Sequence, residues 1–154
     1  MAKQIIGVNR LTPDVELENL NLIDLLSERH IATRRITELA WDKESDIQIS
    51  NSEWLIMAHI YKQQPTIASV TKNLDITRQA THKFIKNLAA KGLVEVQNVE
   101  NNKKEKCIRL TTLGEECHEE HEVVKKQLEN QIAKKIGVDQ LKILKDILKG
   151  DWEI

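Results

Sequence analysis

Residues 66–94, TIASVTKNLDITRQATHKFIKNLAAKGLV, decide the fold that the sequence predicts. A short helix over residues 67–74 is followed by a longer helix over residues 78–91, and a threonine precedes each of them as an N-cap. Gly92 ends the second helix, because glycine readily adopts the left-handed conformation that follows many helices. Two helices of this size joined by a tight turn predict a helix-turn-helix.

The longer of these helices divides into two faces. Its inner face is marked by residues at three- and four-residue steps, namely Thr81, Phe84, Ile85 and Leu88. Its outer face carries Arg78, Gln79, His82, Lys83 and Lys86, with Asn87 at the margin. Arginine and lysine can reach guanine edges and phosphates, and glutamine can pair with adenine. The outer face therefore predicts DNA recognition, and the alternative is a solvated face on an ordinary helix pair.

Two short apolar segments follow the longer helix and predict a β-hairpin. LVEVQNV (93–99) and KCIRL (106–110) alternate apolar and polar residues, as half-buried strands do. The polar stretch NNKKEK (101–106) separates them and is predicted to be the hairpin tip. A helix-turn-helix followed by a hairpin with a basic tip is the order of a winged helix.

Upstream of this region the sequence predicts two more helices. Thr12, Pro13 and Asp14 are typical of a helix start, and apolar residues then recur at helical spacing over about residues 14–42. Ser50 and Glu53 form a capping box before an apolar, central helix that we expect to reach Pro65.

Downstream of the hairpin, Thr112 and Glu115 form a second predicted capping box, and a long helix is expected to run to about Lys135. Gly137 then separates it from a final helix. Apolar stripes mark both C-terminal helices, at Leu128, Ile132, Ile136, Leu141, Leu144, Ile147 and Leu148. A winged helix of roughly 90 residues does not need this much apolar surface. The stripes predict a two-fold dimer, and the alternative is packing within one chain.

Charge is distributed unevenly along the 154 residues, which we expect to form one domain, 1–154. The net charge is −1, but residues 62–109 carry ten Lys/Arg and four Asp/Glu, a balance of +6, against −7 elsewhere. A basic centre between acidic flanks predicts contact with a polyanion, unless the asymmetry is a chance feature of solvated surface.

The sequence gives little support for a disulfide-bonded, secreted or membrane protein, or for an enzyme. The two cysteines, Cys107 and Cys117, form no CxxC pair, and neither a signal peptide nor a bilayer-length apolar run is present. We expect a cytoplasmic protein that does not contact membranes. The sequence has no phosphate loop, nucleophile elbow or paired-carboxylate motif, so we expect neither an enzyme nor a cofactor.

Three segments together resemble the MarR family of bacterial transcriptional regulators: ISNSEWLIMAHI, the stretch 66–94 with its NLAAKGLV, and IRLTTLGEE. The resemblance covers about residues 14–150. It implies a mainly α fold with a small β-hairpin wing, in which the winged helix-turn-helix (47–111) is flanked by N- and C-terminal dimerisation helices (12–44 and 112–150). It also implies a homodimer on a pseudo-palindromic operator of double-stranded DNA, which we expect to repress, with a small effector that weakens binding.

We expect DNA contacts from the outer face of the second helix, from both capping threonines and from the wing. The residues are Thr66, Thr77, Arg78, Gln79, His82, Lys83, Lys86, Lys103 and Lys104. The family usually has an acid, any residue and an arginine at the wing, whereas this chain has Asn102, Lys103 and Lys104. Lysine keeps the charge without the planar fork of arginine. We therefore expect phosphate contact, and insertion into the minor groove stays open.

An effector pocket is predicted between the first helix and the central helix. Its candidates are His30, Arg34, Trp54, Met57 and Tyr61, an aromatic wall with cationic anchors that suits a planar anion. The alternative is that these residues belong to the core and the interfaces.

Two further alternatives concern metal and thiol chemistry. Cys117 and His121 are four residues apart, so they share a helix face and could bind zinc with His30 or Glu28, which would make the chain a metal-responsive or metal-binding protein. Otherwise CHEEHE (117–122) is a polar segment with two surface histidines. Cys107 has cationic neighbours and could sense oxidants, although packing is the simpler role. A winged helix that binds protein instead of DNA is the remaining hypothesis.

Overall fold

The computed structural model describes residues 16–154, apart from the side chain of Lys103, and the chain divides into two compact units. The central unit is Asp42–His121. The terminal unit consists, within the described residues, of 16–41 and 122–154. Helices α1 (Leu22–Glu44) and α5 (Thr112–Ile136) each contribute residues to both units.

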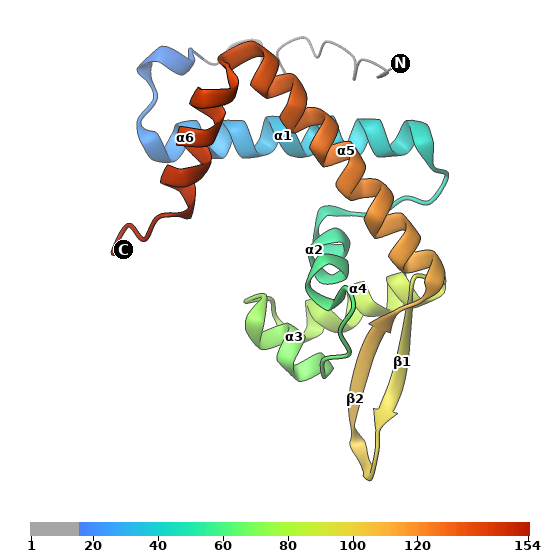
Figure 1. Ribbon diagram of the computed structural model, residues 1–154. Coiled ribbons are helices and arrows are strands. Elements are labelled where there is room, and N and C mark those ends of the chain that lie inside the picture. The colour runs from blue at the N-terminus through green and yellow to red at the C-terminus, as the bar shows by residue number, and fades with distance from the viewer. Residues whose placement is uncertain (1–15) are drawn as a thin grey trace. The chain divides into compact units, whose positions relative to one another are not determined.

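The central unit has the element order of a winged helix (Figure 1). Its elements are α2 (Asn51–Ile60), α3 (Ile67–Asn73), α4 (Arg78–Ala90), β1 (Val94–Val99), β2 (Asn102–Leu110) and the first turns of α5. Both helices of the predicted helix-turn-helix end within one residue of their predicted bounds, since threonine caps and a glycine stop fix them locally.

The core of the central unit is centred on α2, which is apolar on most of its sides as the sequence predicts. Ile56, Met57 and Ile60 of α2 are fully buried, together with Leu88 of α4 and Ile108 of β2. Burying each such side chain contributes about 1.5–3 kcal/mol relative to leaving it exposed, so these contacts stabilise the packing of α4 and the hairpin around α2.

Helix α2 begins where the sequence predicts and ends earlier. The capping box is present, since the Ser50 amide donates to Glu53 Oε2 at 2.9 Å and the Glu53 amide to Ser50 Oγ at 3.3 Å. The predicted end at Pro65 is wrong, because the helix stops at Ile60 and Lys62 takes a left-handed φ of 53°. The residues up to Pro65 instead run beside the hairpin, where the Pro65 carbonyl accepts the amide of Ile108 at 3.0 Å.

The hairpin is antiparallel, with Val94 opposite Leu110 and Val96 opposite Ile108. NNKKEK is not a loop, because β2 begins at Asn102 and includes most of the stretch. The connection is Glu100–Asn101, and Asn101 has a φ of 64°, a conformation that asparagine tolerates better than most residues. The lysines of the stretch therefore belong to a strand, where successive side chains point to opposite faces.

The first long helix of the terminal unit starts later than the sequence predicts. Thr12, Pro13 and Asp14 lie outside the described residues, and a short 3-10 helix, η1 (Leu17–Asn19), precedes α1. Helix α1 begins at Leu22 because Asn21 acts as the cap, its Oδ1 accepting the Asp24 amide at 3.0 Å. An asparagine cap of this kind competes with continuous helix over 14–42.

The C-terminal helices match the prediction except at one cap. Thr111, not Thr112, caps α5, since its Oγ1 accepts the Gly114 amide at 3.0 Å and its carbonyl accepts the Glu115 amide at 2.9 Å. Gly137 separates α5 from α6 (Val138–Lys149) with a φ of 96°, which only glycine adopts easily.

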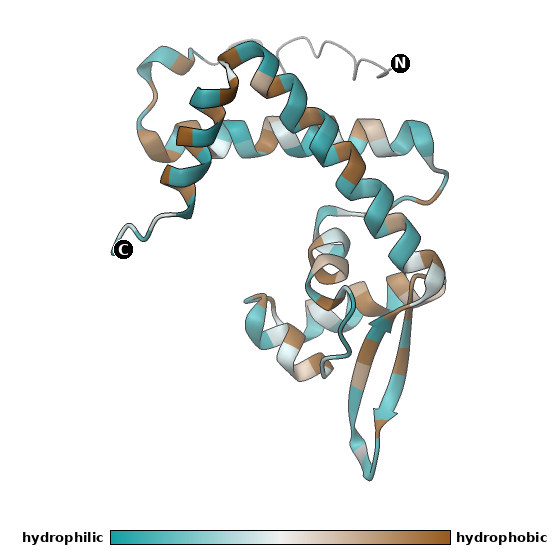
Figure 2. Cartoon of the chain, viewed as in Figure 1, coloured by the Kyte–Doolittle hydropathy of each residue, from teal (hydrophilic) through white to brown (hydrophobic). Residues whose placement is uncertain are grey.

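The terminal unit buries few large apolar side chains. Among the described residues of this unit, Trp41 and Val124 are the buried apolar ones, and α6 has none. Figure 2 shows hydrophobic positions recurring along α6 between hydrophilic ones. Within residues 16–154, no helix is both long and apolar enough to span a membrane.

Candidate nucleic-acid interface

Helix α4 is fixed by its apolar face and its cap. Thr81, Ile85 and Leu88 are buried and Phe84 is half-buried, as the residue spacing predicts. Thr77 caps the helix by accepting the Ala80 amide at 3.1 Å, and Thr81 Oγ1 donates to the Thr77 carbonyl at 2.9 Å. The buried side chains hold the helix on the core, and its other face is left to solvent.

That other face carries all of the recognition-helix residues predicted to contact DNA. They are exposed in every case: Arg78, Gln79, His82, Lys83 and Lys86. The first turn of α4 contains no acidic residue, so its unpaired amides and its dipole favour an anion. The structure thus brings donors and cations together on one surface of a helix whose opposite face is buried.

The capping threonines occupy the positions that the sequence predicts. Thr66 accepts the Ser69 amide at 3.1 Å at the start of α3, and it also pairs with Cys107 of β2 as an isolated bridge. The side-chain oxygens of Thr66 and Thr77 are therefore used within the fold. Any contact of these residues with a phosphate would involve backbone amides of the first helical turn.

At the wing, Asn102 accepts one local hydrogen bond, as an acidic side chain could, and donates another, as a carboxylate could not. Its Oδ1 accepts the Lys104 amide at 3.0 Å, and its Nδ2 donates to Glu105 Oε2 at 3.3 Å. Lys104 is exposed, and the backbone of Lys103 lies in β2. Glu105 places an acid beside the lysines, which weakens the positive potential that the sequence suggests for the tip.

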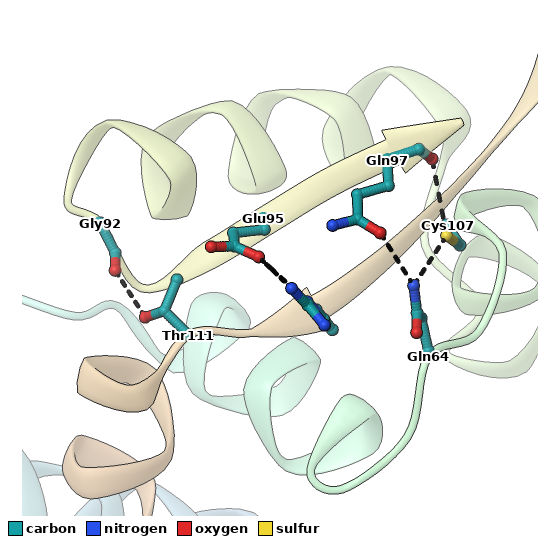
Figure 3. Close-up of polar contacts among 7 residues, drawn as sticks. Gln64, Gly92, Glu95, Gln97, Cys107 and Thr111 are labelled. Carbon is teal, nitrogen blue, oxygen red and sulfur yellow. Dashed lines mark hydrogen bonds and ion pairs between the residues drawn. The ribbon is translucent and has the colours of Figure 1, made fainter. Parts of the chain in front are cut away.

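The base of the wing is tied to the loop before α3 by polar contacts that the sequence did not predict (Figure 3). Gln64 Nε2 lies 3.3 Å from Cys107 Sγ and 3.4 Å from Gln97 Oε1. Arg109 donates two hydrogen bonds to Glu95, at 3.0 and 2.8 Å. Glu95 and Arg109 are opposite one another on the two strands. Opposite charges on strands that are expected to pair could therefore have predicted this contact from the sequence.

Two histidines stack on aromatic residues of α2 and the residue that follows it. The rings of Trp54 and His121 lie 3.8 Å apart and nearly parallel, and those of Tyr61 and His118 lie 4.3 Å apart and tilted. Both histidines are buried, so the expectation of two surface histidines in CHEEHE is wrong. A sequence signal for these contacts is the seven-residue spacing of Trp54 and Tyr61, which brings their two rings to one side of α2.

The structure gives the metal and redox alternatives no support. Within the described residues, no group of three or more His, Cys, Asp and Glu side chains could hold a metal ion. Burial raises the pKa of the Cys117 thiol, which disfavours the thiolate that zinc requires. Cys107 is also a buried free thiol, consistent with packing.

The five candidate effector residues have different surroundings in the structure. Met57 is fully buried, the Trp54 ring lies against His121, and the Tyr61 hydroxyl donates to Glu119 at 2.6 Å. That hydrogen bond raises the pKa of Tyr61. His30 is exposed and Arg34 partly exposed on α1, in the terminal unit.

A polar cavity of about 480 Å³ opens elsewhere in the central unit, at the base of the wing. It is lined by Lys62, Gln63, Gln64, Glu95, Arg109, Leu110, Thr111, Thr112 and Glu115, and contains none of the five candidate effector residues. Its two cations are balanced by two carboxylates, so its lining does not select an anion.

Comparison with known proteins agrees with this geometry. Residues 49–114 match a family of winged helix DNA-binding domains. No curated protein matches the chain.

Solved structures extend the likeness to most of the chain. The reduced form of MarR from E. coli has a TM-score of 0.74 at 22% identity, over 84% of this chain and 95% of that one. FabT from Streptococcus pneumoniae, in complex with DNA, has a TM-score of 0.70 at 22% identity, over 82% and 90%. A variant of E. coli MarR complexed with operator DNA has a TM-score of 0.71 at 23% identity, over 88% and 96%. The chain therefore has the fold of these MarR and FabT structures, and its residues 49–114 are similar to winged helix DNA-binding domains.

Proposed function

We propose that this chain is a transcriptional regulator that binds double-stranded DNA through the exposed face of α4. The single observation that carries the proposal is the environment of that helix: one face is buried, and the opposite face presents cations and hydrogen-bonding side chains without an acidic residue. Such a helix suits the major groove, where arginine, lysine and glutamine read base edges. The MarR fold, shared with two structures solved on DNA, supports the same function.

The proposal assigns separate tasks to the elements of the central unit. Arg78, Gln79 and His82 would meet base edges, since they lie in the first half of α4. Lys83 and Lys86 would meet phosphates, as would Lys103 and Lys104 from the wing and the amides that follow Thr66 and Thr77. Glu105 beside the wing lysines favours backbone contact over insertion into the minor groove.

We propose in addition that the protein acts as a homodimer formed by α1, α5 and α6. The supporting observation is the exposed apolar surface of α6, where Ile143, Leu144, Ile147 and Leu148 are all 43–55% exposed. A two-fold dimer covers such a surface and presents two recognition helices to the two halves of a pseudo-palindromic operator. The proposal includes that the protein binds DNA without catalysing a reaction. It also includes that the protein acts in the cytoplasm, where the chromosome lies. Repression and effector control through His30, Arg34, Trp54, Met57 or Tyr61 stay predictions from the resemblance.

Selection from a pool of random duplex DNA, followed by titration of the selected operator at several salt concentrations, tests the function. We expect salt-sensitive binding, because each lysine that neutralises a phosphate releases counterions. Retention of no sequence at low salt would refute DNA binding and leave protein recognition as the function of the winged helix.

Paired lysine variants locate the surface. Lys83→Ala with Lys86→Ala should weaken binding to every duplex and reduce the salt slope by about 0.9 for each phosphate that is no longer neutralised. The matched control, Lys142→Ala with Lys149→Ala, removes the same charge from exposed positions of α6. Equal effects of both pairs would mean that only net charge matters and that α4 is not the contact surface.

A further inference from the structure

Glu53 is a buried carboxylate that does two things at once. Its side chain is 3% exposed, and its Oε2 accepts the Ser50 amide at 2.9 Å and Lys91 Nζ at 2.7 Å. The first bond belongs to the capping box of α2. The bond with Lys91 joins α2 to a residue 38 positions further along the chain. Because the charge of Glu53 is buried, it is stable only while the ammonium of Lys91 stays in place.

Lys91 is the C-cap residue of α4, the helix proposed to read DNA. The next residue is also held, because the Gly92 carbonyl accepts Thr111 Oγ1 at 2.7 Å (Figure 3). Two contacts from different elements therefore meet at one end of α4. At the other end stands Thr77, whose cap bonds are local to the helix and its own turn.

Helix α4 is therefore held by its buried face and, at its C-terminal end, also by the ion pair of Lys91 with Glu53. Its 13 residues span about 20 Å at 1.5 Å per residue. A tilt of roughly 3° at the C-terminal end would shift the Arg78 end by about 1 Å, which exceeds the roughly 0.5 Å range of good N–H···O distances. Phosphate contacts by long lysines tolerate such a shift, whereas bidentate contacts to a base do not.

We infer that Glu53 and Lys91 are positioning residues for sequence discrimination: their ion pair sets the direction of α4, and so separates specific from non-specific DNA binding. The inference rests on the proposed function and adds to it a pair of residues that touches no base. It does not assign Lys91 a phosphate of its own, since its ammonium is held by Glu53.

Glu53→Gln is the milder variant, because glutamine can keep the capping-box bond and Lys91, with 32% of its side chain exposed, can turn to water. Lys91→Met removes the cation and leaves Glu53 buried without it. Lys91→Arg keeps the charge and a donor. A double variant, Glu53→Gln with Lys91→Met, tests whether the two residues act as one unit.

The measured quantity is the ratio of two dissociation constants, one for unrelated duplex DNA and one for the operator selected by the wild-type chain, with both duplexes of equal length. Full-length proteins are compared over a series of salt concentrations, at a temperature where circular dichroism shows each variant folded. We expect Glu53→Gln and Lys91→Met each to lower the ratio about tenfold, and the double variant to lower it no further. Lys91→Arg should stay within about threefold of the wild type.

Two results would overturn the inference. An unchanged ratio in Glu53→Gln would mean that the ion pair supports stability alone, whatever the melting temperature does. A Lys91→Met variant that loses affinity for both duplexes and lowers the salt slope, while Glu53→Gln does neither, would make Lys91 a direct phosphate contact. Failure of the proposed function is distinguishable from both, because the wild type would then bind neither duplex.

Discussion

The central unit and the terminal unit place similar apolar side chains in opposite environments. Within the described residues, the central unit buries isoleucine, leucine, valine and methionine from α2, α3, α4 and both strands. The terminal unit exposes isoleucine, leucine and valine along α1 and α6, and Ile23 and Val138 are 71% and 74% exposed. Amphipathic helices occur in both units, α4 in the central unit and α6 in the terminal unit, so amphipathicity does not separate them.

The proposed dimer accounts for this contrast, because the central unit covers its apolar side chains from its own elements, whereas the described part of the terminal unit leaves many exposed. Hydrophobic burial stabilises a helix only when another surface covers its apolar face. The winged helix supplies that surface from its own elements. Helix α6 does not have it among the described residues, which is why a second copy of the chain is the partner proposed for it.

The largest expected effect comes from charging the exposed apolar face of α6. Leu144→Asp with Ile147→Asp should dissociate the dimer, raising its dissociation constant by at least about a thousandfold, because each apolar side chain contributes about 1.5–3 kcal/mol when buried and each occurs twice. Light scattering after size-exclusion chromatography measures the mass. Gln140→Asp, on the same helix at an exposed polar position, is the control. A monomeric wild type, or a double variant that stays dimeric, would contradict the proposed interface.

A smaller effect is expected from Gly114→Ala in the central unit. A Cβ at Gly114 would overlap the carbonyl oxygen of Leu93 and lie 3.2 Å from Leu110 Cδ2, so the backbone must move. We expect a decrease of about 1–3 kcal/mol in the free energy of unfolding, measured by urea denaturation at fixed protein concentration.

Gly150→Ala is the matched control in the terminal unit, where a Cβ would make only ordinary contacts and φ is −62°. It should leave the free energy of unfolding within about 0.5 kcal/mol of the wild type. Equal decreases at Gly114 and Gly150 would show that the central unit is no more tightly packed than the terminal one.

The smallest effect concerns an ion pair within the terminal unit. Lys145 Nζ lies 2.5 Å from Glu129 Oε1 and its hydrogen bond lowers the pKa of Glu129, with Lys126 adding to the effect. Because the folded-state pKa is depressed, the pair stabilises the chain above the ordinary glutamate pKa. That stabilisation is lost as the pH falls through the lowered pKa.

The expected contribution is below about 1 kcal/mol, since the pair is partly exposed. Urea denaturation at pH 7 and at about pH 3 should show a smaller pH dependence in Glu129→Gln than in the wild type. Glu116→Gln, an exposed glutamate on the same helix, is the control. A Glu129→Gln variant with the full wild-type pH dependence would mean that the pair adds nothing in solution.

Local sequence signals predicted the winged helix well. Threonine caps, Gly92 and the division of α4 into two faces are properties of neighbouring residues, and each is present in the structure. Signals that compete locally were harder to weigh. Asn21 starts the α1 helix that the structure describes, although the sequence also offers Thr12 as a cap. Thr111 rather than Thr112 caps α5, and these adjacent threonines offer the same capping hydroxyl.

The sequence predicted the candidate site as a set of residues on one helix face. It did not predict the contacts that hold this helix in place. The ion pair of Glu53 with Lys91 and the contact of Thr111 with Gly92 join residues 38 and 19 positions apart. Helical or strand periodicity carries no information at such separations. The heptad spacing of Trp54 and Tyr61 indicates that their rings share a side of α2, but it does not indicate that His121 and His118 cover them.

The sequence by itself determined the order of the elements, the limits of α3 and α4 and the donors on the exposed face of α4, since caps, glycine stops and periodicity act over a few residues. Only the tertiary structure decided that α2 ends at Ile60 and that NNKKEK extends a strand. It also decided that Glu53 and Lys91 hold the end of α4. These features depend on which elements pack side by side, and packing depends on the whole chain at once.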